Sequence, residues 1–184
     1  MSSIKRCKID YIKTQDGKKY LPWQYYNNFG FITLPMVGKR PVIPRWNKAA
    51  KTIHPAYTGD NIGIRTGEVN GITVLDIDVK DNGIEHWQTI SSLHSRIVTP
   101  TVVSPSGIHI YFKFTDKLRT TNRIKIKSKK IGWDVRNNDA VVVAPPSMDP
   151  ATGKKYTWAI SLESTSIKPM PAWLIAYITE HTKQ

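Results

Sequence analysis

A chain of 184 residues with 40% hydrophobic side chains is large enough for one domain with its own core, and its single cysteine excludes a disulfide framework and a thiolate zinc site. The 27 Lys and Arg exceed the 14 Asp and Glu, and the net charge of +13 indicates a polyanionic partner such as nucleic acid or nucleotide phosphate. No stretch reaches the ~18 apolar residues of a membrane-spanning helix, and the first residues lack the apolar core of a signal peptide, so we expect a soluble, intracellular protein without a membrane partner.

The N-terminal part of the chain predicts a leader and the first elements of a domain. Residues 1–19 are polar and rich in lysine, and we interpret them as a loosely held basic leader. Residues 20–28 predict a short helix, and residues 29–37 predict a strand. In the basic, proline-bearing loop over residues 38–52, we expect Trp46 to fill part of the core.

Two aliphatic segments, NIGIRTG (61–67) and ITVLDIDV (72–79), predict strands joined by the turn EVNG. Because alternate residues of a strand share a face, Asp76 and Asp78 point away from the neighbouring aliphatic side chains. Two carboxylates held about 6–7 Å apart repel each other unless something positive lies between them. Two explanations follow: one acid caps the next element while the other forms a salt bridge, or the pair binds a divalent metal.

A helix is expected after the second of these strands. Asn82 and Glu85 fit a capping box at its start. Its apolar residues recur at a spacing of three, which predicts one buried stripe formed by Ile84, Trp87, Ile90 and Leu93.

The segments TPTVVS (99–104) and IHIYFKF (108–114) predict a β-hairpin around the turn PSG. Its second strand carries apolar residues on one face and His109 on the other. Ser106 and Gly107 precede this histidine, and a glycine allows the backbone to approach a ligand closely. A lone histidine is more often a packed or a surface residue, but beside a triphosphate it could donate a hydrogen bond to phosphate oxygens.

Residues 117–130 contain seven Lys and Arg and no acid. A solvated surface is the usual role of such a charge run. Here the alternation of cations with Ile124 and Ile126 favours a half-buried strand or ribbon whose cationic side follows a nucleic-acid backbone. The candidate nucleic-acid-binding residues are Arg123, Lys125, Lys127, Lys129 and Lys130.

The C-terminal part predicts three more strands and a helix. IGWDVR and AVVVAPPS are expected as strands around the turn NNDA, and the turn DPATGKK leads to the strand KYTWAI. PAWLIAYITEH predicts a final helix with Pro171 in its first turn. Together the elements predict a single α+β (or α/β) domain with an antiparallel-rich sheet.

A third acid, Asp134, interrupts the apolar context of IGWDVR. Three carboxylates on strands suit Mg²⁺ or Mn²⁺, which prefer oxygen ligands, and two such ions about 3.5–4 Å apart can catalyse a phosphoryl displacement. Four cations are candidate phosphate ligands, although a solvated surface charge is an alternative for each: Lys39, Arg40, Arg65 and Arg136.

The order of these motifs resembles the bifunctional primase–polymerase (Prim-Pol) family of the archaeo-eukaryotic primase superfamily, which occurs in plasmids, phages, integrated elements and large DNA viruses. The resemblance runs from about Phe29 to Ile178. It is carried by an acidic D-x-D strand, a Ser-containing turn leading to a histidine, and a later Asp on a strand. The flanking segments GKRPVIPRW, NIGIRTG, SPSGIHIYF, VVVAPPS, TGKKYTW and MPAWL are similar too. The turn before the histidine is shorter than the double-glycine turn of many relatives.

The resemblance implies a catalytic domain over residues 20–184, with an N-terminal α/β lobe packed on an RRM-like lobe. It implies that Asp76, Asp78 and Asp134 hold two Mg²⁺ or Mn²⁺ ions, with His109 also in the catalytic centre. The implied nucleotide ligands are Ser106, Gly107, His109, Arg136, Lys39 and Arg65. The implied partners are a single-stranded DNA template, a dNTP or NTP, and a helicase domain or protein, since the sequence has no P-loop of its own.

Three other functions compete with this interpretation. A glycosyltransferase also uses a D-x-D motif, but that would leave Asp134 and the charge of +13 unexplained. A rolling-circle nickase needs two histidines around one hydrophobic residue, and HIY at 109–111 supplies one. The main alternative is a non-catalytic nucleic-acid-binding module of the same fold, and against it stand three carboxylates on a surface that would face phosphate.

Overall fold

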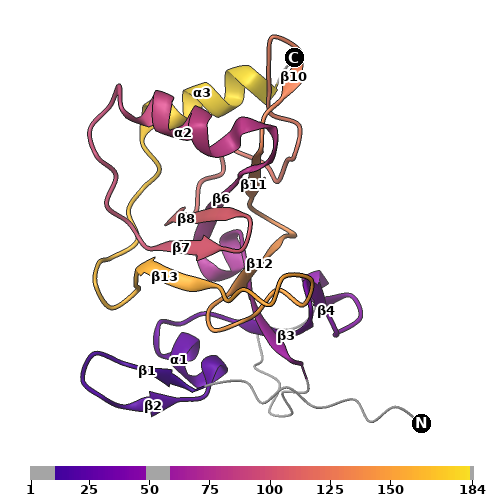
Figure 1. The fold of residues 1–184 in the computed structure, drawn as a ribbon, viewed down its shortest axis with the longest axis vertical. Helices are drawn as coiled ribbons and strands as arrows, with labels where there is room; N and C mark the ends of the chain where they lie inside the picture. Colours follow the sequence, from indigo (N-terminus) through magenta and orange to yellow (C-terminus); the bar gives the residue numbers. More distant parts are fainter. Residues whose placement is uncertain (1–10, 49–58, 183–184) are drawn as a thin grey trace.

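Two antiparallel sheets with helices on their outer faces form the computed structural model, which describes residues 11–48 and 59–182 (Figure 1). The architecture is mixed α+β with antiparallel sheets, as the sequence predicted. The larger sheet has five strands, in the spatial order β11 (Trp133–Arg136), β6 (Ile72–Asp78), β8 (Gly107–Lys113), β7 (Thr101–Ser104) and β13 (Thr157–Ile160). The predicted hairpin is confirmed as β7 and β8, with Ser104 opposite Gly107.

The smaller sheet has four strands, in the order β12 (Val141–Ala144), β5 (Asn61–Arg65), β3 (Thr33–Val37) and β4 (Arg40–Pro41). Two of the predicted turns have an unexpected role. The chain leaves β5 in the small sheet and enters β6 in the large sheet, and it returns from β11 to β12. These turns therefore connect the two sheets and do not close hairpins.

Three α-helices and several short elements complete the fold. The helices are α1 (Pro22–Asn28), α2 (Gly83–Ser91) and α3 (Ala172–Thr182). Two small hairpins are formed by β1 (Ile12–Lys13) with β2 (Lys19–Tyr20), and by β9 (Lys125–Ile126) with β10 (Lys129–Lys130). The 3₁₀ turns are η1 (Trp46–Lys48), η2 (Glu68–Asn70) and η3 (Lys80–Asn82).

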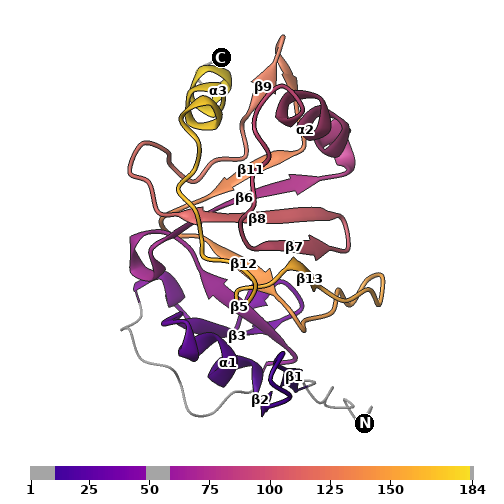
Figure 2. The same cartoon turned by 90° about the vertical axis from the view of Figure 1, so that its left-hand side faces the viewer.

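The large sheet buries both of its faces, and each face has its own core (Figure 2). Helices α2 and α3 cover one face, where Leu75, Ile77 and the fully buried Trp133 pack against Leu174 of α3. The indole N–H of Trp133 donates to the carbonyl of Gly83 at 2.8 Å, which attaches the start of α2 to β11.

The second core lies between the other face of the large sheet, the small sheet and α1. Val74 and Tyr111 of the large sheet contribute to it, together with Tyr26 of α1 and Ile62 of the small sheet. The alternation of β6 thus divides its side chains between two cores, because successive residues point to opposite faces. Its acidic positions, 76 and 78, share the face of Val74.

Four local expectations were wrong. Trp46 is half-buried in η1 and belongs to neither core. Asn82 has left-handed backbone angles (φ 54°) and its side chain makes no capping hydrogen bond, so the capping box is absent. Because α2 ends at Ser91, Leu93 lies beyond the helix and is 73% exposed. The sequence predicted no element before residue 20, yet β1 and β2 form a hairpin there.

The division of the chain into a leader (1–19) and a catalytic domain (20–184) remains a prediction, and residues 1–10 lie outside the described part. Within the described part, no helix is both long enough and apolar enough to cross a membrane.

Candidate active site

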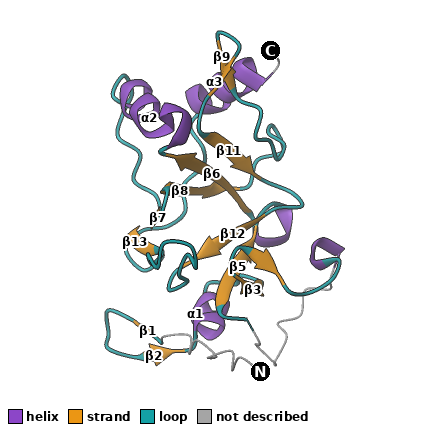
Figure 3. Cartoon of the chain, turned by 45° about the vertical axis from the view of Figure 1, so that its right-hand side comes forward, coloured by secondary structure: helices purple, strands orange, loops and turns teal. Residues whose placement is uncertain are grey.

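A row of polar residues crosses three adjacent strands of the large sheet. Asp134 on β11 lies opposite Asp76 on β6, and Asp76 lies opposite His109 on β8. Directly paired residues of an antiparallel sheet point to the same face, so these three side chains are neighbours. Figure 3 shows the three strands side by side. Segments that are far apart in the sequence are therefore brought together as the resemblance implied.

Arg136 lies between the two acids of this row. Its Nη2 atom is 2.7 Å from Asp134 Oδ2 and 3.3 Å from Asp76 Oδ2. His109 approaches the other oxygen of Asp76, with 3.4 Å between Nε2 and Oδ1. The sequence suggested Arg136 as a phosphate ligand, whereas in the structure it is paired with carboxylates.

Asp78 stands at the end of β6, directly opposite Gly107. The hydroxyl of Ser106 donates to Asp78 Oδ1 at 3.0 Å, and Lys80 Nζ lies 3.0 Å from Asp78 Oδ2. The sequence reasoning missed Lys80. Its position two residues after Asp78 is a signal that could have identified it, since chain neighbours of a strand end often pair with its last charge.

Gly107 is required for a close approach between strands. A Cβ atom at this position would lie 1.9 Å from the carbonyl oxygen of Ile77. The sequence predicted that this glycine lets the backbone approach a ligand. In the structure, the close neighbour is the backbone of β6.

Burial shifts the pKa values of two residues in this row, His109 and Asp134. It lowers the pKa of His109, which is only 6% exposed, and it does so against the opposing influence of Asp76. The imidazole is thus favoured in its neutral form, with one N–H to donate. Burial also raises the pKa of Asp134, while the guanidinium of Arg136 acts in the opposite direction. The Nδ1 atom of His109 is buried without a hydrogen-bond partner in the described part of the chain.

Lys39 reaches the same region from the turn between β3 and β4. Its ammonium forms an ion pair with Asp149 at 2.9 Å, and this pairing raises the pKa of Lys39. The charge of Asp78 raises it further, which indicates that the ammonium lies within electrostatic reach of the acids. Tyr156 packs beside His109 with 5.8 Å between ring centres. The sequence gave no signal for Asp149 or Tyr156 as parts of the site.

Arg65 and Arg40 are placed differently. Arg65 is buried in β5, where its Nη2 donates to the carbonyl of Asn47 at 2.7 Å. It lines a cavity with Trp46 and other residues, and none of the three acids lines that cavity. Arg40 is exposed at the start of β4.

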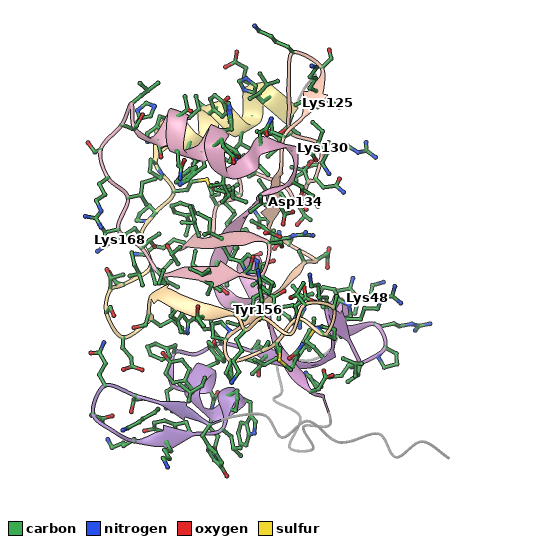
Figure 4. All side chains as sticks on the ribbon, viewed as in Figure 1. Lys48, Lys125, Lys130, Asp134, Tyr156 and Lys168 are labelled. Atoms are coloured by element: carbon green, nitrogen blue, oxygen red, sulfur yellow. The ribbon has the colours of Figure 1, made fainter. Side chains whose placement is uncertain are left out.

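The predicted cationic ribbon is present as the β9–β10 hairpin. Ile124 beside it is fully buried, and Lys127 and Ser128 form its turn with positive φ angles of 47° and 65°. Lys125 and Lys130 lie on the side of the molecule that carries Asp134 (Figure 4). β10 ends at Lys130, shortly before β11 begins at Trp133, so the ribbon leads into the strand that carries Asp134. Nucleic-acid binding by these residues and by the exposed Arg123 stays a prediction.

The donor chemistry of the three acids suits Mg²⁺ or Mn²⁺, because all three offer hard carboxylate oxygens on strands. In the structure, these carboxylates form ion pairs with cationic side chains of the protein. In the described part of the chain, no three His, Cys, Asp or Glu side chains form a group that could hold a metal ion. Asp76 and Asp134 instead face Arg136, and Asp78 faces Lys80.

Comparison with known proteins identifies one family. Residues 23–173 match the family model described as "Bifunctional DNA primase/polymerase, N-terminal" (Prim-Pol), which covers well over half of the chain. The matched range includes the acidic row, the Ser106 turn and the cationic ribbon. No curated protein sequence matches the chain.

Proposed function

Since the chain belongs to the bifunctional DNA primase/polymerase family, we propose that it catalyses template-directed nucleotidyl transfer in DNA replication, as a primase, a polymerase or both. The observation that supports this most strongly is the row of Asp134, Asp76 and His109, in which two carboxylates and a buried imidazole share one sheet face. In this proposal, the small sheet with α1 corresponds to the α/β lobe and the large sheet to the RRM-like lobe.

The carboxylates of Asp76, Asp78 and Asp134 would hold the metal ions. Two bound Mg²⁺ or Mn²⁺ ions would supply a more acidic attacking hydroxyl and charge neutralisation at the triphosphate. His109, whose pKa is lowered by burial, would donate a hydrogen bond to a phosphate oxygen. Ser106 and Arg136, which contact Asp78 and Asp134, would bind the same triphosphate together with Lys39.

The template would bind along the cationic ribbon. Lys127, Lys129 and Lys130 are exposed and Lys125 is half-buried, and the ribbon leads into β11, which carries Asp134, so a single strand that follows it would reach the acids. A helicase domain or protein would supply the unwound strand, since no P-loop occurs in the sequence. In this proposal, such a protein would act in the replication of a virus, plasmid or other mobile element.

A nucleotide-incorporation assay tests the proposal. The purified chain is incubated with single-stranded DNA, Mg²⁺ or Mn²⁺, and labelled dNTPs or NTPs, with and without an annealed primer. The double variant Asp76→Asn/Asp78→Asn should lose product while it still binds DNA. Asp116→Asn removes one exposed acid outside the row and serves as the matched control.

The primed and unprimed reactions separate polymerase from primase activity. Product from the wild type and from Asp116→Asn, but not from the double variant, would support nucleotidyl transfer. An absence of product from the wild type, together with DNA binding that is indifferent to metal, would instead favour the non-catalytic binding module.

A further inference from the structure

One guanidinium nitrogen holds the two facing acids of the active-site row together. Nη2 of Arg136 contacts Asp134 Oδ2 at 2.7 Å and Asp76 Oδ2 at 3.3 Å. These acids are register partners on adjacent strands, where like charges repel each other. Arg136 therefore neutralises a repulsion that the strand pairing imposes.

Arg136 contacts the two acids through only one of its guanidinium nitrogens. A guanidinium commonly binds a carboxylate through two parallel N–H donors, but here one nitrogen serves both acids. Its Nε is buried without a hydrogen-bond partner in the described part of the chain. The side chain is 34% exposed, so solvent lies along a path by which it can leave. The guanidinium is thus attached to the acids through one nitrogen and is partly exposed to solvent.

Arg136 also occupies the position that a divalent cation needs. The two oxygens that receive its Nη2 are the ones that converge between β11 and β6. A cation bound jointly by Asp76 and Asp134 must contact those carboxylates at close range, at about 2.0–2.1 Å for Mg²⁺. The guanidinium and the metal therefore exclude each other.

We propose that Arg136 is a placeholder cation, which holds Asp76 and Asp134 in the metal-free protein and leaves them when a divalent metal binds. This inference rests on the proposed function, since it assumes that these acids bind metal. Once released, Arg136 lies beside the site with a free guanidinium, and an anionic triphosphate is the ligand it suits. Metal entry would in this way prepare a phosphate-binding group.

Lys80 provides a matched comparison. It also pairs with an acid of the site, at 3.0 Å from Asp78, but its side chain is 61% exposed and it contacts one carboxylate only. An exposed ion pair of this kind contributes little. The variants Lys80→Gln and Arg136→Gln remove the same charge. A difference in their Mn²⁺ affinity therefore reports the position that the lost cation occupied and not the change in net charge.

The first test measures Mn²⁺ binding without nucleotide or DNA, from the electron paramagnetic resonance signal of the free ion. Arg136→Gln should bind Mn²⁺ at least about tenfold more tightly than the wild type, because no charge-assisted hydrogen bonds need to be broken. Lys80→Gln should differ from the wild type by less than about threefold. Mn²⁺ should also raise the melting temperature of Arg136→Gln more than that of the wild type.

Equal affinities in the wild type and Arg136→Gln, or equal gains in the two variants, would overturn the inference while leaving the proposed function intact. An absence of Mn²⁺ binding in all three proteins would overturn both the inference and the metal-dependent mechanism.

A second measurement uses the wild type and does not depend on the folding of a variant. The Nε–H signals of the arginines are followed by NMR as Mg²⁺ is added, and the Arg136 signal is assigned by its absence in Arg136→Lys. The signal should shift with the same concentration dependence as Mg²⁺ binding. A signal that stays unchanged while Mg²⁺ binds would show that the guanidinium does not leave, which would refute the proposal.

Discussion

Replacing Gly107 by alanine tests whether the contact between β6 and β8 positions the site. The added Cβ would lie 1.9 Å from the carbonyl oxygen of Ile77 and 2.9 Å from the Cα of Asp78, whereas Cβ atoms essentially never come within 3.0 Å of such neighbours. Because both neighbours are backbone atoms, no side-chain rotation relieves the clash. The two strands must separate by about 1 Å at this point.

This separation should affect both stability and activity. Overpacking of this kind costs about 1–3 kcal/mol, and more where backbone must move, so we expect the free energy of unfolding to fall by about 3 kcal/mol. The shift also draws Ser106 away from Asp78, which it now contacts at 3.0 Å. A displacement of 1 Å among reacting groups can lower a rate about 100-fold, and nucleotide incorporation should fall by that order.

The assay combines urea unfolding with primer extension, and Gly153→Ala is the control. Gly153 has a positive φ (68°), which Gly107 does not, and nothing lies within 4 Å of its added Cβ. In Gly153→Ala, the free energy of unfolding should fall by only about 1–2 kcal/mol, the cost of a side chain at positive φ, and activity should be kept. If Gly107→Ala were no less stable than Gly153→Ala and equally active, the close approach of the strands would not be what positions the site.

Three further outcomes are expected. Burial lowers the pKa of His86 from its ordinary 6.5, so the unfolded state binds the proton more readily than the folded state. The stability that neutral His86 contributes is present above pH 6.5 and is lost as pH falls. The variant His86→Gln should therefore show a weaker pH dependence of the urea unfolding midpoint between about pH 7.5 and 5. Lys125→Gln and Lys129→Gln should each reduce the salt dependence of single-stranded DNA binding by about 0.7 in the log–log slope, whereas Lys168→Gln, on the opposite side of the molecule in Figure 4, should leave it unchanged. Trp133→Ala should cost about 3–5 kcal/mol in urea unfolding, because the ring is fully buried and its N–H donates to a backbone carbonyl.

Local patterns in the sequence predicted most of the elements. The alternation in β6 assigned Asp76 and Asp78 to one face, because the two-residue period follows from strand geometry alone. The same reasoning placed His109 on the face of β8 opposite to Ile108 and Ile110, although that face is buried with Tyr111 against the second core, and the turn at Ser106 predicted the hairpin. Asp134 was grouped with them by the metal-binding chemistry of three carboxylates on strands and by the resemblance, because no local pattern relates a residue at 134 to one at 76.

Other features depended on the tertiary structure. The sequence predicted turns after β5 and β11 but not the partners of these strands, and each turn carries the chain into the other sheet. A turn sequence specifies how the chain reverses, but the partner of a strand depends on which sheet edge offers a matching apolar face. Side-chain partners are decided in the same way, as for Lys39 and Asp149, which are brought together from distant segments.

The sequence by itself thus determined the class of fold, the faces of the strands and the acidic and basic character of the site. The tertiary structure decided that Arg136 bridges Asp76 and Asp134 and that His109 is buried, which lowers the pKa of its imidazole. The physical reason is that strand period and charge are local properties of the chain. Register, burial and ion pairing arise only when segments distant in sequence pack against each other.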